Sequence, residues 1–224
     1  MKKFKYFSVA LIVTAAVAIG VAPGTAAAST HDPVLFVHGW NGKASGWDIM
    51  KADFAANGWS ASELNTISYG TESNITVANA IKTKVTQILA ANPGKTKVDL
   101  ISHSMGGLST RYYVKNLGGA ALVDDFVSLA GPNHGTNLAL ACVLISVQCA
   151  QMAPNSSFLK SLNATDETPG TPNYATWWST DDEIILPASS TPLAGAVNTK
   201  VSGLKHADMK TNPAIVAGVR AFVN

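Results

Sequence analysis

The sequence predicts an α/β fold: a mostly parallel sheet of about six strands, flanked by helices on both faces. Short, unbroken apolar runs are the first observation, and residues 33–37 (PVLFV) show it best, because a strand buried on both faces lacks polar alternation. Segments with helical spacing of apolar residues alternate with these runs, as at residues 46–58 and 76–94. This alternation is typical of βαβ units, in which consecutive strands run parallel.

The individual elements follow from apolar spacing and from their end signals. Trp47, Met50 and Phe54 lie on one side of the first predicted helix, which Gly58 ends. Strands are predicted at residues 33–37, 65–69, 97–102, 124–131, 174–180 and 196–204. Helices are predicted at residues 46–58, 76–94, 105–119 and 213–223. Residues 132–172 break the rhythm, so we expect a single domain, residues 29–224, with an excursion in its second half.

The first 28 residues have the three regions of a secretory signal peptide. Lys2, Lys3 and Lys5 come first, an uncharged apolar run follows, and small residues end at an Ala-x-Ala site. A retained membrane anchor is the alternative, but the run of about 15 apolar residues is shorter than the roughly 18–20 that span a bilayer. We therefore expect cleavage after Ala28 and secretion.

The charge balance changes when this peptide is removed. The whole chain has 16 basic and 14 acidic residues, and loss of three lysines leaves 13 basic against 14 acidic. A nearly neutral protein lacks the basic surface that binds nucleic acid. No later segment is long and apolar enough to cross a bilayer, and we expect a monomer.

Cys142 and Cys149 are the two cysteines, and an oxidising compartment favours a disulfide between them. Seven residues of straight helix rise about 10.5 Å, whereas the Cα atoms of a disulfide lie within about 7 Å. The bond therefore predicts a break in any helix between them. Two free, buried thiols are the alternative.

The stretch DLISHSMGG places Ser104 between a predicted strand and a predicted helix. In a parallel sheet this is the carboxyl end of a strand, where ligands bind. A sharp strand–turn–helix turn exposes a nucleophile and needs small residues two positions before and after it. Gly106 fits, and Ser102 stands where the usual pattern has glycine. Gly107 either leaves room for substrate or lets the helix pack closely. The alternative role for Ser104 is an N-cap of the helix.

A serine nucleophile needs a base and an acid that orients the base. In hydrolases with this turn the chain order is Ser, acid, His, so His206, which follows the last strand, is the expected base. The earlier histidines are His31, His38, His103 and His134. Asp181, Asp182 and Glu183 follow a strand, and any one of them could orient the imidazole.

An ester-cleaving site also needs N–H donors for the developing oxyanion. One is the N–H of Met105, directly after the nucleophile. The second is expected in the loop after the first strand, where Gly39 allows the chain to turn so that the Trp40 N–H faces the site. Trp40 also places an aromatic wall beside an acyl chain.

Taken in order, these segments resemble the small secreted bacterial triacylglycerol lipases of the lipase class 2 group, which have the α/β-hydrolase fold. The matching stretches are PVLFVHGWNG, KVDLISHSMGG, RYYVKNLGG, VSLAGPNHGT and WWSTDDEIILP, together with the late His206. The resemblance implies Ser104 as nucleophile, His206 as base, and Asp182 rather than Asp181 as acid. It implies no cofactor, and at most a small cap formed by residues 132–172. The acidic residues are too scattered in the sequence to predict a metal site.

The resemblance and the residues together predict a secreted serine hydrolase of carboxylic esters, with triacylglycerol as the expected substrate class. A carboxylesterase or polyester hydrolase that prefers short or polymeric esters is the alternative, since the same three residues serve both. A binding protein that kept the fold and lost catalysis is disfavoured, because the set of Ser, acid and His is complete.

Overall fold

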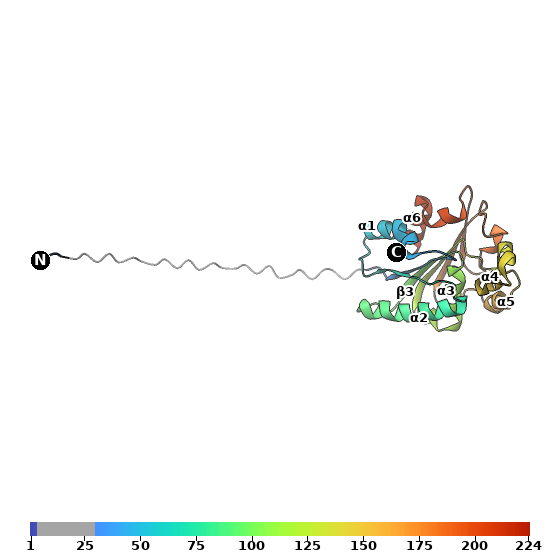
Figure 1. Cartoon of the computed structure of the whole chain (residues 1–224), viewed down its shortest axis with the longest axis horizontal. Coiled ribbons are helices and arrows are strands. Elements are labelled where there is room, and N and C mark those ends of the chain that lie inside the picture. The colour runs from blue at the N-terminus through green and yellow to red at the C-terminus, as the bar shows by residue number, and fades with distance from the viewer. Residues whose placement is uncertain (4–29) are drawn as a thin grey trace.

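A six-stranded sheet lies at the centre of the part of the chain that the computed structural model describes, residues 1–3 and 30–224 (Figure 1). Its order is β2-β1-β3-β4-β5-β6, and every neighbouring pair is parallel. The predicted fold class is confirmed. The strands are β1 (Val34–Val37), β2 (Leu64–Ile67), β3 (Val98–His103), β4 (Val123–Leu129), β5 (Asn173–Ser179) and β6 (Val197–Val201).

Helices cover both faces of the sheet, as the alternation of patterns predicted. α1 and α6 pack together on one face, and α2 and α3 pack together on the other (Figure 1). The four are α1 (Asp48–Ala56), α2 (Asn74–Ala91), α3 (Gly106–Asn116) and α6 (Pro213–Phe222).

The side chains of β1 explain why its sequence is continuously apolar. Val34 and Phe36 enter the core beneath α1 and α6, whereas Leu35 and Val37 enter the core beneath α2 and α3. All four are fully buried. A strand covered on both faces therefore has no position that favours a polar side chain.

Element ends differ from the sequence prediction by a few residues. The first helix is preceded by a 3-10 turn, and β6 ends at Val201 rather than at residue 204. Gly203 has a φ of +74°, and its N–H donates to Asp181, which turns the chain out of the sheet. The 3-10 segments are η1 (Ala44–Trp47), η2 (Gly119–Ala121), η3 (Asn137–Cys142), η4 (Ala188–Ser190) and η5 (His206–Lys210).

The chain reverses its direction of travel across the sheet between β1 and β3. β2 lies on one side of β1, and the chain then crosses to place β3 on the other side. Loops at the carboxyl ends of two such strands diverge and leave a crevice where α/β proteins bind ligands. Gly39 comes just after β1 and Ser104 directly after β3, so both lie at this crevice.

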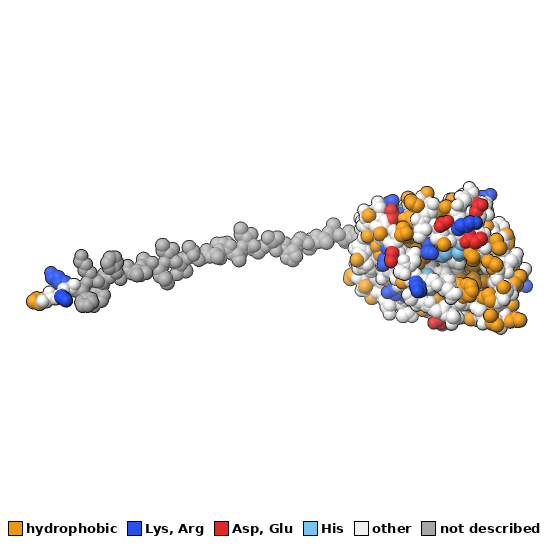
Figure 2. Space-filling model, turned by 45° about the horizontal axis from the view of Figure 1, so that its top comes forward, with side chains coloured by type: hydrophobic (Ala, Val, Ile, Leu, Met, Phe, Trp, Pro, Cys, Tyr) orange, Lys and Arg blue, Asp and Glu red, His pale blue; other side chains and the backbone are white. Residues whose placement is uncertain are grey.

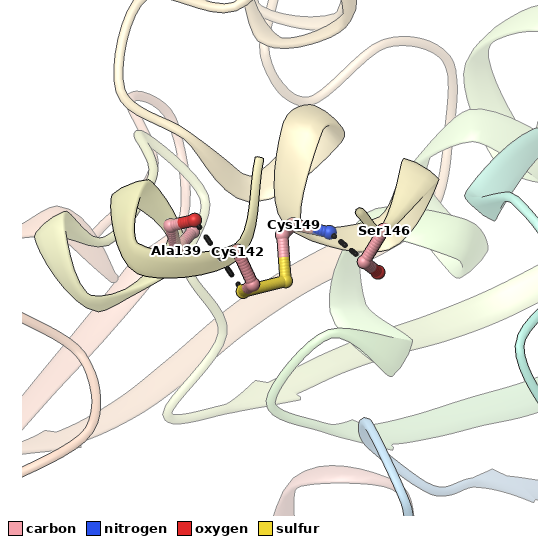
Figure 3. The surroundings of a disulfide bond; sticks show 4 residues. All are labelled: Ala139, Cys142, Ser146 and Cys149. Carbon is pink, nitrogen blue, oxygen red and sulfur yellow. Dashed lines mark hydrogen bonds between the residues drawn. A yellow bond between two sulfur atoms is a disulfide. The ribbon is translucent and has the colours of Figure 1, made fainter. Parts of the chain in front are cut away.

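The excursion predicted at residues 132–172 forms no strand and consists of short helices. After η3 come α4 (Val147–Met152) and α5 (Ser157–Asn163). A disulfide joins Cys142 at the end of η3 to Cys149 in α4, with Cα atoms 5.6 Å apart (Figure 3). The predicted disulfide and the predicted break in the helix are both confirmed.

Residues 4–29 contain most of the predicted signal peptide and its cleavage site, and that prediction lies outside the described residues. Among the helices that the structure does describe, none combines the length and the hydropathy that a membrane span requires.

Candidate active site

Ser104 occupies a sharp turn between a strand and a helix. It directly follows β3, and only Met105 separates it from α3. Its φ is +56°, a left-handed conformation that is strained for a residue with a side chain. The Ser104 N–H donates to Leu129 O on β4 at 2.9 Å, which secures the turn to the sheet.

Small residues stand where the backbone around this turn is crowded. A Cβ on Gly106 would lie 2.5 Å from His38 O and 2.7 Å from Val37 O, so only glycine fits. Ser102 fits at the earlier position because its buried hydroxyl donates to Val127 O at 2.8 Å.

A Cβ on Gly107 would lie 2.7 Å from Ser128 Oγ, on the protein side of the helix. Of the two roles left open for Gly107, the structure therefore supports close packing rather than room for substrate.

His206 and Asp182 meet beside this turn although 24 positions separate them. Nδ1 of His206, at the start of η5, lies 2.8 Å from Asp182 Oδ2, and both residues are buried. The other oxygen of Asp182 accepts the N–H groups of Ile184 and Ile185 at 2.8 and 2.9 Å. The imidazole and the two backbone N–H groups all bond to the Asp182 carboxylate, and together they hold it against the imidazole.

The electrostatics of Asp182 favour the charged form. Burial alone would raise its pKa, but the hydrogen bond and charge of His206, with the two backbone donors, hold the pKa below its ordinary value. An ionised Asp182 can orient the ring and stabilise an imidazolium.

The neighbouring acids do not reach the imidazole. Asp181 is exposed and accepts the N–H of Gly203 at 2.7 Å. Glu183 accepts the backbone N–H of His206 at 3.1 Å, and so holds the loop rather than the ring. Of the three acids that the residues alone left open, Asp182 is the one that contacts the His206 side chain.

Ser104 and His206 line the same pocket, which has a volume of about 280 Å³. Nδ1 of His206 is occupied by Asp182, which leaves Nε2 to receive a proton. No hydrogen bond joins the described side chains of Ser104 and His206; such contacts are often long before substrate binds.

The two expected oxyanion donors, Trp40 and Met105, directly follow Gly39 and Ser104 in the chain. Gly39 packs against Ser104 so closely that a Cβ there would be 2.6 Å from Ser104 Cβ. The following residue, Trp40, lines the pocket, and Met105 immediately precedes α3. Within the described residues, neither the Trp40 N–H nor the Met105 N–H donates a hydrogen bond. Both donors remain available for a ligand.

A second, strongly apolar pocket of about 380 Å³ also opens at Ser104. The excursion supplies one wall through Leu138, Ala139, Met152 and the disulfide, and the loop after β5 supplies Ile184 and Ile185. The expected small cap is thus a wall of this pocket. Figure 2 shows histidine side chains in a surface hollow, with a broad hydrophobic area beside it.

His103 contributes a contact that sequence reasoning missed. Its Nε2 lies 3.0 Å from the backbone oxygen of His206, and the two rings are 4.6 Å apart. Burial, and then the nearby His206, lower the pKa of His103 to about 3, so the ring is neutral. A neutral ring that faces a carbonyl must donate from Nε2. Nothing in the sequence signals this contact, because the two residues are 103 positions apart.

A parallel sheet with a serine on a strand–helix turn, and an Asp–His pair at the same edge, is typical of the α/β-hydrolases. The model of the lipase (class 2) family matches residues 31–216. The chain therefore belongs to the lipase (class 2) family, and it is a serine ester hydrolase.

Solved structures with low sequence identity share this fold. Bacillus licheniformis lipase BlEst2 in mature form matches with a TM-score of 0.73 and 19% identity, over 87% of this chain and 93% of that chain. Aspergillus fumigatus lipase B matches with a TM-score of 0.70 and 20% identity, over 87% of this chain and 53% of that chain. MGS-MChE2, an α/β hydrolase enzyme from a lagoon-sediment metagenome, matches with a TM-score of 0.58 and 16% identity, over 85% and 89%.

Proposed function

We propose that the protein is a secreted triacylglycerol lipase whose catalytic triad is Ser104, Asp182 and His206. One observation carries the proposal: the imidazole held by Asp182 lines the same pocket as the hydroxyl of the strained Ser104. The family supplies the ester-cleaving chemistry, and these three residues have the chemical types that such chemistry needs.

In the first half of the reaction, Ser104 Oγ attacks the ester carbonyl carbon while His206 Nε2 takes the hydroxyl proton. Asp182 stabilises the imidazolium that results. The oxyanion receives hydrogen bonds from the Trp40 and Met105 N–H groups, each worth roughly 2.7–4 kcal/mol in the transition state. When the ester C–O bond breaks, His206 returns the proton to the leaving alcohol.

In the second half, water replaces the alcohol. His206 removes a proton from water, the hydroxide attacks the acyl carbon, and the bond to Ser104 Oγ breaks as the hydroxyl regains its proton. The acyl chain occupies the apolar pocket of about 380 Å³, because its walls are almost wholly hydrocarbon. This pocket favours a long or medium apolar acyl group.

Replacement of the nucleophile tests the proposal. Ser104→Ala is expected to lower kcat on esters by about 10⁴–10⁶-fold and to leave the fold intact, because only the oxyanion donors and binding remain. Ser102→Ala is the matched control, since it removes a hydroxyl from the same strand end, and it should keep activity within a few-fold. Equal activity in Ser104→Ala and wild type would remove the assignment.

The acid is tested by a pair of neighbouring variants. Asp182→Asn should lower kcat by about 10⁴-fold, because an amide at this position favours the wrong tautomer of the imidazole and does not stabilise its positive charge. Asp181→Asn should leave kcat unchanged, since that side chain contacts Gly203 and Thr180. The reverse order of the two effects would identify Asp181 as the acid.

A carboxylesterase or polyester hydrolase is the second candidate, favoured by the other pocket at Ser104. That pocket is less apolar than the first, because the polar side chains of His38, Lys43 and Lys210 contribute to its walls, and it suits a shorter or more polar group. Rates measured across ester acyl lengths, with emulsified triglyceride as the last substrate, distinguish the two candidates. A sharp optimum at short, dissolved esters would favour the esterase.

Secretion belongs to the proposal as well. The basic and apolar regions of residues 1–28 support export, and the Cys142–Cys149 disulfide suits an oxidising compartment. N-terminal sequencing of protein from the culture medium should read Ser29 first, and its mass should correspond to a single domain, residues 29–224. Sedimentation should give a monomer.

A further inference from the structure

Ser104 lies between two pockets, and only one of them contains the proposed base. Ser104 and Trp40 line both pockets, whereas His206 lines only the pocket of about 280 Å³. In the proposed mechanism His206 gives its proton to the leaving alcohol, so the alcohol leaves on the side of His206. The acyl chain then occupies the apolar pocket, and the alcohol part of the ester occupies the pocket with His206, here called the alcohol-side pocket.

The alcohol-side pocket carries positive charge without a balancing acid. Lys43 and Lys210 line it, and none of its described lining residues is Asp or Glu. The ion pairs of the described residues involve other groups, so no carboxylate pairs with either ammonium group. Two cations in a pocket without a carboxylate attract an anion.

Lys210 is held at this pocket by packing. It ends η5, the 3-10 segment that begins at His206, and its stem lies against Gly46, where a Cβ would be 3.3 Å from Lys210 Cε. The side chain is half-buried, and this burial lowers the pKa of its amine with no carboxylate to offset the effect. A cation that has lost water without gaining a partner binds an anion more strongly than a fully hydrated one does.

Lys43 comes from the loop that follows β1. This loop turns tightly, because the N–H of Gly42 donates to Gly39 O at 3.0 Å and a Cβ on Gly42 would lie 2.9 Å from His38 Cβ. Lys43 directly follows the turn and precedes η1. The loop that contains the proposed oxyanion donor therefore also supplies a cation to the alcohol-side pocket.

Phosphate suits these two cations better than a carboxylate does. A phosphate monoester carries about −1.5 to −2 charge at pH 7 and has three strong acceptor oxygens, whereas a carboxylate carries one charge and two oxygens. Each lysine offers three N–H donors on a compact charge, which is how lysine binds phosphate. Glycerol phosphate is an alcohol that carries both an acyl ester and such a phosphate.

We propose that Lys43 and Lys210 form a subsite for a phosphate on the alcohol part of the ester, so that the enzyme also cleaves acyl esters of glycerol phosphate. This inference rests on the proposed function, because it assigns a substrate class to the same site. The bond between the acyl carbon and the glycerol oxygen breaks as Ser104 Oγ takes the acyl group. His206 returns the proton to that oxygen, and water then releases the acid. The phosphate stays on the glycerol throughout.

Two dissolved esters with the same acyl group test the proposal. They are 1-butyryl-glycerol 3-phosphate and 1-butyrylglycerol, and the measured quantity is the ratio of their kcat/KM values at pH 8 and low ionic strength. Lys43→Gln/Lys210→Gln should lower the ratio of phosphate ester to neutral ester at least about tenfold, because charge-assisted contacts to phosphate are lost. Lys210→Glu should lower the ratio further than Lys210→Gln does, since a carboxylate repels phosphate.

Lys82→Gln/Lys84→Gln is the matched control. It removes the same charge from α2, and neither residue lines the alcohol-side pocket, so the ratio should stay at the wild-type value. Added salt should lower the wild-type ratio, because it screens the attraction between the lysines and phosphate. An unchanged ratio in Lys43→Gln/Lys210→Gln would overturn the proposal, and so would an equal drop in the control.

Binding without turnover separates this proposal from the proposed function. In the Ser104→Ala background, calorimetry gives the Kd of 1-butyryl-glycerol 3-phosphate, and Lys43→Gln/Lys210→Gln should raise it at least about tenfold. Equal Kd values with and without the two lysines would refute the phosphate subsite. A wild-type enzyme that cleaves no ester would instead refute the proposed function, and the calorimetry would still decide whether the subsite binds phosphate.

Discussion

Gly106 and Gly107 come just after Ser104 and Met105, and their surroundings predict different effects on substitution. In Gly106→Ala the new Cβ meets two backbone oxygens of the segment that leads to Gly39. Because these backbone oxygens cannot rotate away from the new Cβ as a side chain could, we expect a loss of about 1–3 kcal/mol in the free energy of unfolding. We also expect kcat to fall at least about tenfold, because the same shift moves the Trp40 N–H, the proposed oxyanion donor.

Gly107→Ala is the matched comparison. Its Cβ meets Ser128 Oγ, a hydroxyl that has no hydrogen-bond partner and can rotate. Alanine also loses less backbone entropy than glycine on folding, by about 0.4–1 kcal/mol where φ is negative, which offsets the remaining contact. Denaturant unfolding should therefore show a much smaller change than in Gly106→Ala. Equal losses in both variants would contradict the argument.

His103 predicts a specific dependence of stability on pH. Its pKa is about 3 in the folded protein, lowered first by burial, against about 6.5 in an unfolded chain. Below pH 6.5 the unfolded chain therefore binds a proton that the folded protein does not. The free energy of unfolding should fall by about 1.4 kcal/mol per pH unit on acidification, until the pH reaches about 3.

His103→Gln removes this titration and keeps a donor for the His206 carbonyl oxygen. Urea unfolding at pH 5 and at pH 8 should show a drop about 2 kcal/mol smaller in the variant than in wild type. Other groups titrate in this range too, but they are common to both proteins and cancel in the comparison. An identical drop in the two would mean that His103 is protonated in the folded state.

At the scale of elements, the excursion depends on a covalent tie and on α3. Lys115 of α3 donates to Leu162 O and Ala164 O, the free carbonyls at the end of α5, at 3.0 and 2.5 Å. Buried Arg111, one turn earlier, donates to Asn163 Oδ1 at 2.8 Å. Two cationic side chains thus satisfy the carboxyl end of a short helix. α3, which begins two residues after Ser104, therefore also positions the wall of the apolar pocket.

We expect the disulfide in that wall to contribute measurably to the free energy of unfolding. A cross-link that closes a loop of this length stabilises by about 2–3 kcal/mol through the entropy of the unfolded chain. Cys142→Ala/Cys149→Ala should lower the melting temperature by about 5–10 °C. A reductant should lower the melting temperature of the wild type to that of the double variant, and it should leave the melting temperature of the double variant unchanged. A wild-type melting curve insensitive to reduction would contradict this.

Some elements were predictable because their own residue types indicate that they are buried. β1 is apolar throughout, β3 carries the apolar residues Val98, Leu100 and Ile101, and α1 has its buried Met50 and Phe54 one turn apart. β6 was predicted too long because it is an edge strand with exposed positions, so composition does not mark its end. The 3-10 segments lack a periodic signal.

The site was predictable only in part for a related reason. The turn around Ser104 is local, and the order of the chemical groups limits the base to a late histidine. The choice among the three consecutive acids depends on how the loop after β5 folds. Because adjacent residues belong to the same loop, the sequence does not show which carboxylate contacts the imidazole. Contacts between distant segments, such as the one between His103 and His206, have no local pattern.

At the scale of the whole molecule, the two edges of the sheet differ in chemistry. The carboxyl edge carries the candidate active site. At the amino edge, carboxylate oxygens of Asp32, Asp99 and Asp124 lie within 4.8 Å of one another. These acids are far apart in the sequence, so no local pattern predicts that they meet. Lys95 lies 3.7 Å from Asp32 and Lys97 lies 2.6 Å from Asp124, whereas Oδ2 of buried Asp99 has no partner.

This arrangement makes the folded protein retain a proton on Asp99. Burial, and then the charges of Asp125 and Asp32, raise the pKa of Asp99 well above its ordinary value. Between about pH 4 and that raised pKa, the unfolded chain has lost a proton that the folded protein keeps. The free energy of unfolding therefore falls as the pH rises through this window.

Asp99→Asn removes that titration without changing the shape of the side chain. Its amide oxygen still accepts from the Asp125 N–H, and its NH₂ group stands where the unpartnered oxygen stood, facing two carboxylates. At pH 8 the variant should be more stable than wild type, and the difference should shrink as the pH falls towards about 4. Asp124→Asn is the control, because its exposed pair with Lys97 is worth about 0–1 kcal/mol. Since the amino edge lies across the sheet from Ser104, kcat/KM on a dissolved ester should not change in either variant. A variant that is less stable than wild type at pH 8 would show that Asp99 is ionised and paired in the folded protein.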